Sequence, residues 1–121
     1  MIRSRAIMFA VVEIAMAFGI PFTLTCLNKT MKATAHPQVE TDRVIVTEWR
    51  FAPGAETGHH VHAYDYVVVP ITTGTLRLEE PEGTREVQLQ AGVSYARSKG
   101  VTHNVINANA FEFSFVEIEL K

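Results

Sequence analysis

Cysteine is almost absent from this 121-residue chain, and the single cysteine, Cys26, lies in its N-terminal quarter. One cysteine cannot form an internal disulfide, and the rest of the chain has no thiol nucleophile. Basic residues are also scarce after residue 35, where seven lysines and arginines face twelve aspartates and glutamates, a net charge of −5. An acidic segment without a basic patch argues against a nucleic-acid partner.

Helical periodicity is equally scarce, since no stretch after residue 36 repeats apolar residues every three or four positions. Residues 43–51 instead alternate between two faces, and residues 65–71 are almost continuously apolar, as in a strand covered on both sides. The sequence Pro81-Glu82-Gly83-Thr84 marks a hairpin turn between two further alternating runs. Seven or eight short strands at this spacing predict an all-β fold, either a sandwich or a barrel.

The last predicted strand changes parity along its length. Aromatic residues occupy the odd positions 111, 113 and 115, whereas aliphatic residues occupy the even positions 116, 118 and 120. Two adjacent apolar residues at the change of parity predict a β-bulge near residues 115–116.

The first 35 residues differ from the rest and define a separate segment, so we divide the chain into residues 1–35 and 36–121. Arg3 and Arg5 precede a hydrophobic run over residues 6–27, and the segment has a net charge of +3. Three interpretations remain open: an export signal cleaved after small residues near position 35, a retained membrane anchor, or a non-native extension upstream of Met31. The last would make the protein cytoplasmic. Glu13 weakens the anchor, because a central carboxylate costs about 2.5–3.5 kcal/mol on insertion.

Three of the five histidines gather in the stretch GHHVHAYDYVVVPITTG, residues 58–74. On a strand His60 and His62 share one face, while His59 points to the other. Two neighbouring imidazoles form half of a metal site, and His103 is the candidate for a third ligand. Imidazole suits iron, manganese, nickel, copper or zinc, so we expect one divalent transition metal.

Two stretches resemble the two sequence motifs of the cupin superfamily (RmlC-like cupins). The first is residues 58–74, with its HxH pair and closing glycine; the second is GVSYARSKGVTHNVIN, residues 92–107. The resemblance covers about residues 40–121 and is strongest to small single-domain bacterial cupins. It implies a double-stranded β-helix, a jelly-roll-like barrel, with His60, His62 and His103 as metal ligands. It also implies a homodimer formed by strand exchange or sheet packing.

One departure from the cupin pattern affects the expected site. The family places a ligand glutamate seven residues before the closing glycine, where this chain has Val67. Asp65 shares the parity of Val67, so we consider it as a fourth ligand, as a hydrogen-bond acceptor behind an imidazole, or as a solvated turn residue. Tyr64 and Tyr66 have the opposite parity and are expected to pack outside.

Two residues of the second motif are candidates for contacts near the metal. Asn107 lies four residues after His103 on the same face, where it could point inward or cap a turn. Arg97 could bind a substrate carboxylate through a bidentate pair, or it could be a surface charge.

Two functions from different classes follow. The first is a metal-dependent enzyme on a small carboxylate or amino-acid-derived metabolite, for example an Fe(II) dioxygenase. The second is a non-catalytic cupin that senses a small molecule or serves a structural role beside a catabolic pathway. An arginine that points inward near the metal favours the first, whereas a cavity filled by aromatic side chains favours the second.

Overall fold

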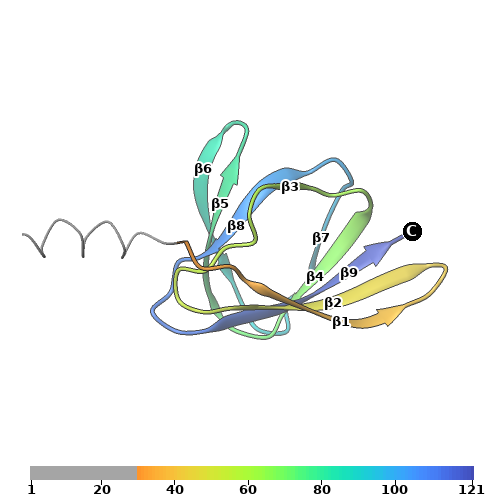
Figure 1. Ribbon diagram of the computed structural model, residues 1–121, viewed down its shortest axis with the longest axis horizontal. Helices are drawn as coiled ribbons and strands as arrows, with labels where there is room; N and C mark the ends of the chain where they lie inside the picture. The colour runs from red at the N-terminus through yellow and green to blue at the C-terminus, as the bar shows by residue number, and fades with distance from the viewer. Residues whose placement is uncertain (1–29) are drawn as a thin grey trace, which may run out of the picture.

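The computed structural model describes residues 30–121, and within this range every regular element is a β-strand (Figure 1). Five strands form one sheet in the order β1-β2-β9-β4-β7: β1 (Thr34–Glu40), β2 (Val44–Phe51), β9 (Phe113–Leu120), β4 (Asp65–Pro70) and β7 (Tyr95–Arg97). Four strands form the second sheet in the order β3-β8-β5-β6: β3 (His60–Val61), β8 (Thr102–Asn107), β5 (Gly74–Glu80) and β6 (Gly83–Leu89). All pairings between named strands are antiparallel.

The two sheets wrap around a common interior, as Figure 1 shows, and the predicted all-β barrel is confirmed. The predicted hairpin is β5–β6, in which Glu80 pairs with Gly83 across a two-residue turn. The nine strands within residues 30–121 exceed the expected seven or eight. One reason is that β1 forms where the sequence showed no alternation, and its residues are exposed throughout.

The strand β9 lies at the centre of the five-stranded sheet and corrects one prediction. It pairs in regular register with β2, from Phe51↔Phe113 to Val44↔Leu120, and also with β4. The bulge predicted near residues 115–116 is therefore wrong. Because both edges of β9 are bonded into ladders, odd-numbered residues face inward along its whole length, through Glu117 and Glu119.

The hydrophobic core lies between the two sheets. Phe51 and Phe113 are fully buried and directly paired across β2 and β9, and Phe115 stacks beside Phe51 with ring centroids 5.5 Å apart. Leu76 and Leu78 of β5 complete the core from the other sheet. Phe115, Leu76 and Leu78 also line the cavity that contains the histidines, so the core forms the apolar part of that cavity.

The described N-terminal residues join the barrel slightly before the predicted boundary at residue 36. The amide of Glu56 donates to the carbonyl of Met31, and the amide of Ala33 donates to the carbonyl of Glu56. Within residues 30–121 there is no helix long and apolar enough to span a membrane. The hydrophobic run over residues 6–27 and Cys26 lie outside the described residues, and the three interpretations of the leader stay predictions.

Candidate metal centre

Three histidine side chains converge at the open end of the barrel. The register His60↔His103 between β3 and β8 places these two residues directly opposite each other, and His62 follows β3 on the same face. The Nε2 atom of His62 lies 3.1 Å from Nε2 of His60 and 3.0 Å from Nε2 of His103. His59 and Val61 point away and are exposed, as the alternation predicted.

No single placement of protons allows the Nε2 atoms of all three histidines to form hydrogen bonds with one another. Nδ1 of His60 lies 2.8 Å from the carbonyl oxygen of Gly58, which can only accept, so the ring proton of a neutral His60 is on Nδ1 and its Nε2 carries a lone pair. The single Nε2 of His62 then cannot form hydrogen bonds with both neighbours. A cation among the three resolves the conflict, since a metal–nitrogen bond of about 2.0–2.1 Å puts adjacent ligand nitrogens about 3 Å apart.

The electrostatic environment keeps two of these imidazoles neutral. Burial, followed by the proximity of His60, lowers the pKa of His62 to about 4 and that of His103 to about 3. Neutral imidazoles have the free lone pair that a metal needs. The three histidines therefore fit a divalent transition metal in number, protonation and spacing.

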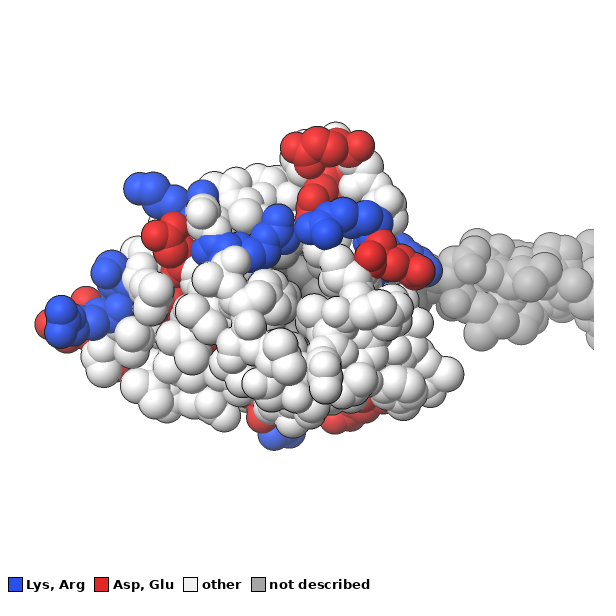
Figure 2. Space-filling model, turned by 180° about the vertical axis from the view of Figure 1, so that it is seen from behind, with Lys and Arg blue, Asp and Glu red and all other residues white. Residues whose placement is uncertain are grey.

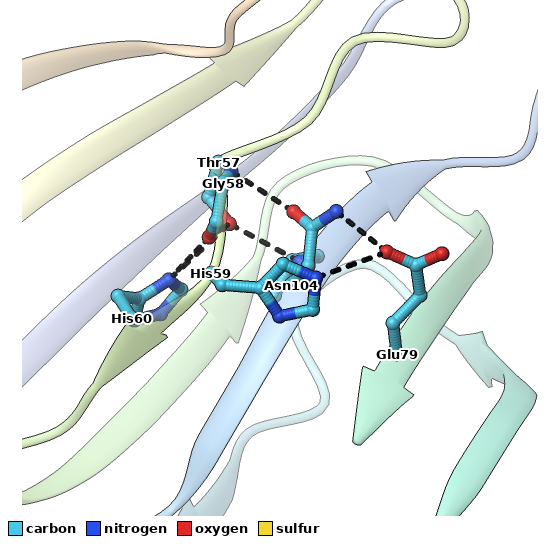
Figure 3. Close-up of polar contacts among 7 residues, drawn as sticks. Thr57, Gly58, His59, His60, Glu79 and Asn104 are labelled. Atoms are coloured by element: carbon cyan, nitrogen blue, oxygen red, sulfur yellow. Dashed lines mark hydrogen bonds and ion pairs between the residues drawn. The ribbon is translucent and has the colours of Figure 1, made fainter. Parts of the chain in front are cut away.

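A hydrogen-bond network orients the strand that carries His60 (Figure 3). The side-chain oxygen of the buried Asn104 accepts from the amide of Gly58 at 2.9 Å, and its amide group donates to Glu79 at 2.8 Å. Gly58 adopts φ 85°, a conformation that favours glycine, and its carbonyl holds His60. Asn104 thus positions a candidate ligand without touching it, a role that sequence analysis missed because no motif marks this residue.

Tyr66 lies inside the barrel, which contradicts the expectation that it packs outside. Its side chain is 2% exposed and stacks on His62, with ring centroids 3.8 Å apart. Burial alternates along β4 so that Tyr66, Val68 and Pro70 are buried. The inward position nearest the histidines is therefore Tyr66, one residue before the Val67 at which the family spacing places its glutamate.

Asp65 takes the third of the roles considered for it, that of a turn residue. It is exposed on the outer face of β4, and its carboxylate accepts the backbone amide of Lys99 at 2.8 Å. Asp65 is not a hydrogen-bond acceptor behind one of the imidazoles, because the residues of β4 that face inward are the even-numbered ones, beginning with Tyr66.

The other two candidates separate in space. Asn107 is buried but caps turns: its side-chain amide contacts the carbonyls of Phe51, Ala52 and Phe111, and its oxygen accepts from Asn109. Arg97 lines the cavity beside the histidines and lies 3.5 Å from a carboxylate oxygen of Glu80. Arg97 thus lines the cavity beside the histidines, whereas Asn107, although buried, does not.

The cavity in front of the histidines has a volume of about 330 Å³, enough for a small metabolite. One side, the histidine wall, consists of His60, His62 and His103. The other, which we call the opposite wall, comes from the five-stranded sheet and comprises Trp49, Tyr66, Tyr95, Arg97, Glu117 and Glu119.

Glu117 and Glu119 are functional candidates that the sequence analysis missed. Glu117 is only 8% exposed, and burial, followed by hydrogen bonding with Glu119, raises its pKa to about 8. The signal was present, because the alternation of Phe113 and Phe115 continues unbroken to both glutamates. The even-numbered aliphatic residues of the same strand obscure this signal, because they predict a change of face.

Comparison with known proteins gives consistent results. Residues 47–119 match the family model described as a cupin domain. The β-alanine degradation protein BauB of Pseudomonas aeruginosa is 66% identical over 84 residues, which cover 69% of this chain and 88% of that protein.

Solved structures agree with this match. A cupin domain from Bordetella pertussis is 59% identical, with a TM-score of 0.76 over 77% of this chain and 97% of that chain. The polyketide cyclase RemF from Streptomyces resistomycificus is 17% identical, with a TM-score of 0.61 over 76% of this chain and 69% of that chain, a likeness of fold alone.

Proposed function

Because this chain belongs to the cupin family, we propose that it holds one divalent transition metal through His60, His62 and His103 and binds or acts on a small metabolite beside it. The observation that carries the proposal is the convergence of three Nε2 atoms at 3.0–3.1 Å, which a central cation satisfies. When bound, the metal would supply a Lewis acid with positions open to a ligand.

The metabolite we propose is a small carboxylate or an amino-acid derivative. Arg97 lines the cavity and offers a planar guanidinium to a carboxylate, which is the feature that favours a substrate anion over a filled barrel. The name of the related BauB protein, which refers to β-alanine degradation, is consistent with this class. The positive charges of the metal ion and of Arg97 would together attract the carboxylate.

The test is the metal content of the chain purified without a histidine tag, before and after reconstitution with iron, manganese, nickel, copper or zinc. We expect about one metal per chain, lost in His103→Ala, because removing one of three ligands leaves a poor site. The matched control is His59→Ala, an exposed histidine that faces away. A wild-type chain that takes up no metal, or equal loss in both variants, would refute the site.

Catalysis is tested separately on the loaded protein. If the metal is iron, the measurement is oxygen consumption in the presence of small amino acids and carboxylates. Binding of such a compound without turnover would favour the non-catalytic cupin considered from the sequence.

We further propose that two copies form a homodimer through the outer face of the five-stranded sheet. Even-numbered positions of β2 and β9 and odd-numbered positions of β4 give this face a block of half-buried aliphatic side chains: Val44, Val46, Val67, Val69, Val116 and Ile118. On the side of the molecule in Figure 2, charged residues lie mainly across the upper half and at the edges, and the middle of the lower half carries few. Light scattering should give twice the monomer mass, and Val69→Glu should reduce it to that of one chain.

A further inference from the structure

The opposite wall contains two carboxylates that lack a positive partner. Glu117 and Glu119 face the cavity from β9, and among residues 30–121 neither forms an ion pair with a lysine, arginine or histidine. A buried carboxylate without a counter-ion is costly, and Glu117 is only 8% exposed. A cation brought by a ligand would remove it.

A second feature of the same wall independently indicates a polar ligand. The hydroxyl of Tyr66 is buried and has no hydrogen-bond partner within the described part of the chain. Tyr66 lines the cavity and lies directly opposite Glu119 in the register between β4 and β9. A buried hydroxyl without a partner is rare, so a donor or acceptor on a bound molecule is the expected partner.

The register between the strands also gives the order of positive and negative residues across this wall. Glu119, Tyr66 and Arg97 are consecutive partners across β9, β4 and β7. Neighbouring strands are about 4.7–4.9 Å apart, so the backbones at the carboxylate and the guanidinium are separated by about 10 Å. A molecule with an ammonium at one end and a carboxylate at the other matches this order of charges.

A second metal bound by His62, Glu117 and Glu119 is the competing occupant, since the ligand atoms of these residues lie within 4.8 Å of one another. However, Nε2 of His62 already faces Nε2 of both other histidines. One lone pair serves one metal, which leaves the two glutamates without a nitrogen ligand. An organic cation needs no such ligand, and the neighbouring Trp49 ring suits it.

Because the metal centre proposed above, on which this inference rests, lies beside the glutamate pair, we propose that the cavity selects a small zwitterionic amino acid. Its ammonium group binds Glu117 and Glu119, and its carboxylate is held by Arg97 and the metal. Simple carboxylic acids that lack the amine leave the glutamate pair uncompensated and bind less tightly.

The test compares matched ligands on the metal-loaded chain by calorimetry, in a buffer free of primary amines. The probes are 3-aminopropanoate, 4-aminobutanoate, and the propanoate and butanoate that lack the amine. We expect each amino acid to bind at least about tenfold more tightly than its deaminated counterpart. In Glu117→Gln and Glu119→Gln this ratio should fall to about one, with metal content unchanged and a melting temperature no lower than that of the wild type.

The matched control is Glu112→Gln, an exposed glutamate just before β9 that does not line the cavity, which should keep the wild-type ratio. Equal binding of the paired ligands by the wild-type chain would overturn the proposal. Loss of metal in Glu117→Gln would overturn it as well, since it would make this carboxylate a metal ligand. Absence of metal from the wild-type chain is a different result, which refutes the metal centre while the ligand ratio still reports on the glutamate pair.

Discussion

The two walls of the cavity are built in different ways. The histidine wall takes His103 from β8, but His60 belongs to β3, a strand of only two residues, and His62 follows it. The loop before β3 is held by the side chains of Asn104 and Thr57. The opposite wall rests on β9 and its neighbours, where uninterrupted ladders hold every inward residue in register. The difference shows that ligand geometry at the histidines depends on side-chain hydrogen bonds and on the metal, whereas the opposite wall is set by the backbone.

Metal removal should produce the largest difference between the walls. At a metal concentration 100 times the dissociation constant, binding stabilises the fold by about 2.7 kcal/mol, so chelation should lower the melting temperature by about 10–20 °C. Amide exchange should then accelerate at His60, Val61 and Thr102, while β9 stays protected. Hydrogen-exchange mass spectrometry measures both.

The control for chelation is His103→Ala, in which the same chelator should change neither melting nor exchange. Equal acceleration of exchange in β9 and in β3 would show that the walls do not differ in the way described.

Substitutions of two buried asparagines should have effects of intermediate size and test the comparison between the two walls further. Asn104→Ala removes the acceptor for the amide of Gly58, so metal affinity should fall about 10- to 100-fold, the usual effect of losing support behind a ligand. Asn107→Ala removes three contacts to carbonyls far from the histidines and should cost about 1–3 kcal/mol of stability with metal affinity unchanged. Metal titration and denaturant unfolding of both variants separate the effects.

Asn104→Asp refines this test, because it retains the acceptor for Gly58 but places a negative charge beside Glu79. Its metal affinity should lie between those of the wild type and Asn104→Ala. An equal loss of affinity in Asn104→Ala and Asn107→Ala would make both residues merely structural.

The smallest effect on stability is expected for Tyr66→Phe. The hydroxyl has no partner to lose, so the free energy of unfolding should stay within about 1 kcal/mol of the wild type or rise. The stacking of the ring on His62 is retained, so metal content should also be unchanged. Thermal unfolding and elemental analysis check this, and a loss of more than about 2 kcal/mol would reveal a hydrogen bond that the structure does not contain.

Two residues of the histidine wall could be predicted from the sequence because they are close together in it, whereas His103, 41 residues from His62, was proposed from its place in the second cupin-like motif. His60 and His62 are two apart on one strand, and their common face follows from alternation alone. The opposite wall was not accessible, because it draws one or two residues from each of four strands whose pairing no local pattern specifies. Arg97 was recognised as a candidate, but its inward position became clear only from its register with Tyr66.

Two errors had the same physical origin, the assignment of a strand's faces. Family spacing placed the inward position of β4 at Val67, whereas burial places it at Tyr66, and this difference moved Asp65 to the outside. In β9 the even-numbered aliphatic residues line the outer face of the sheet rather than a shifted inner face. Apolar residues on both faces of a strand remove the contrast from which its orientation is inferred.

The central position of β9 has a consequence for the order in which this molecule folds. The hairpin β5–β6 closes over a two-residue turn, but β9 must find β2 across most of the described chain, as the pair Val44↔Leu120 shows. Long-range antiparallel pairing of this kind is slow, on the order of milliseconds to seconds, because loop closure costs entropy before any contact is gained. Glu117 and Glu119 belong to β9. A partly folded chain can therefore contain the β5–β6 hairpin before the cavity has formed.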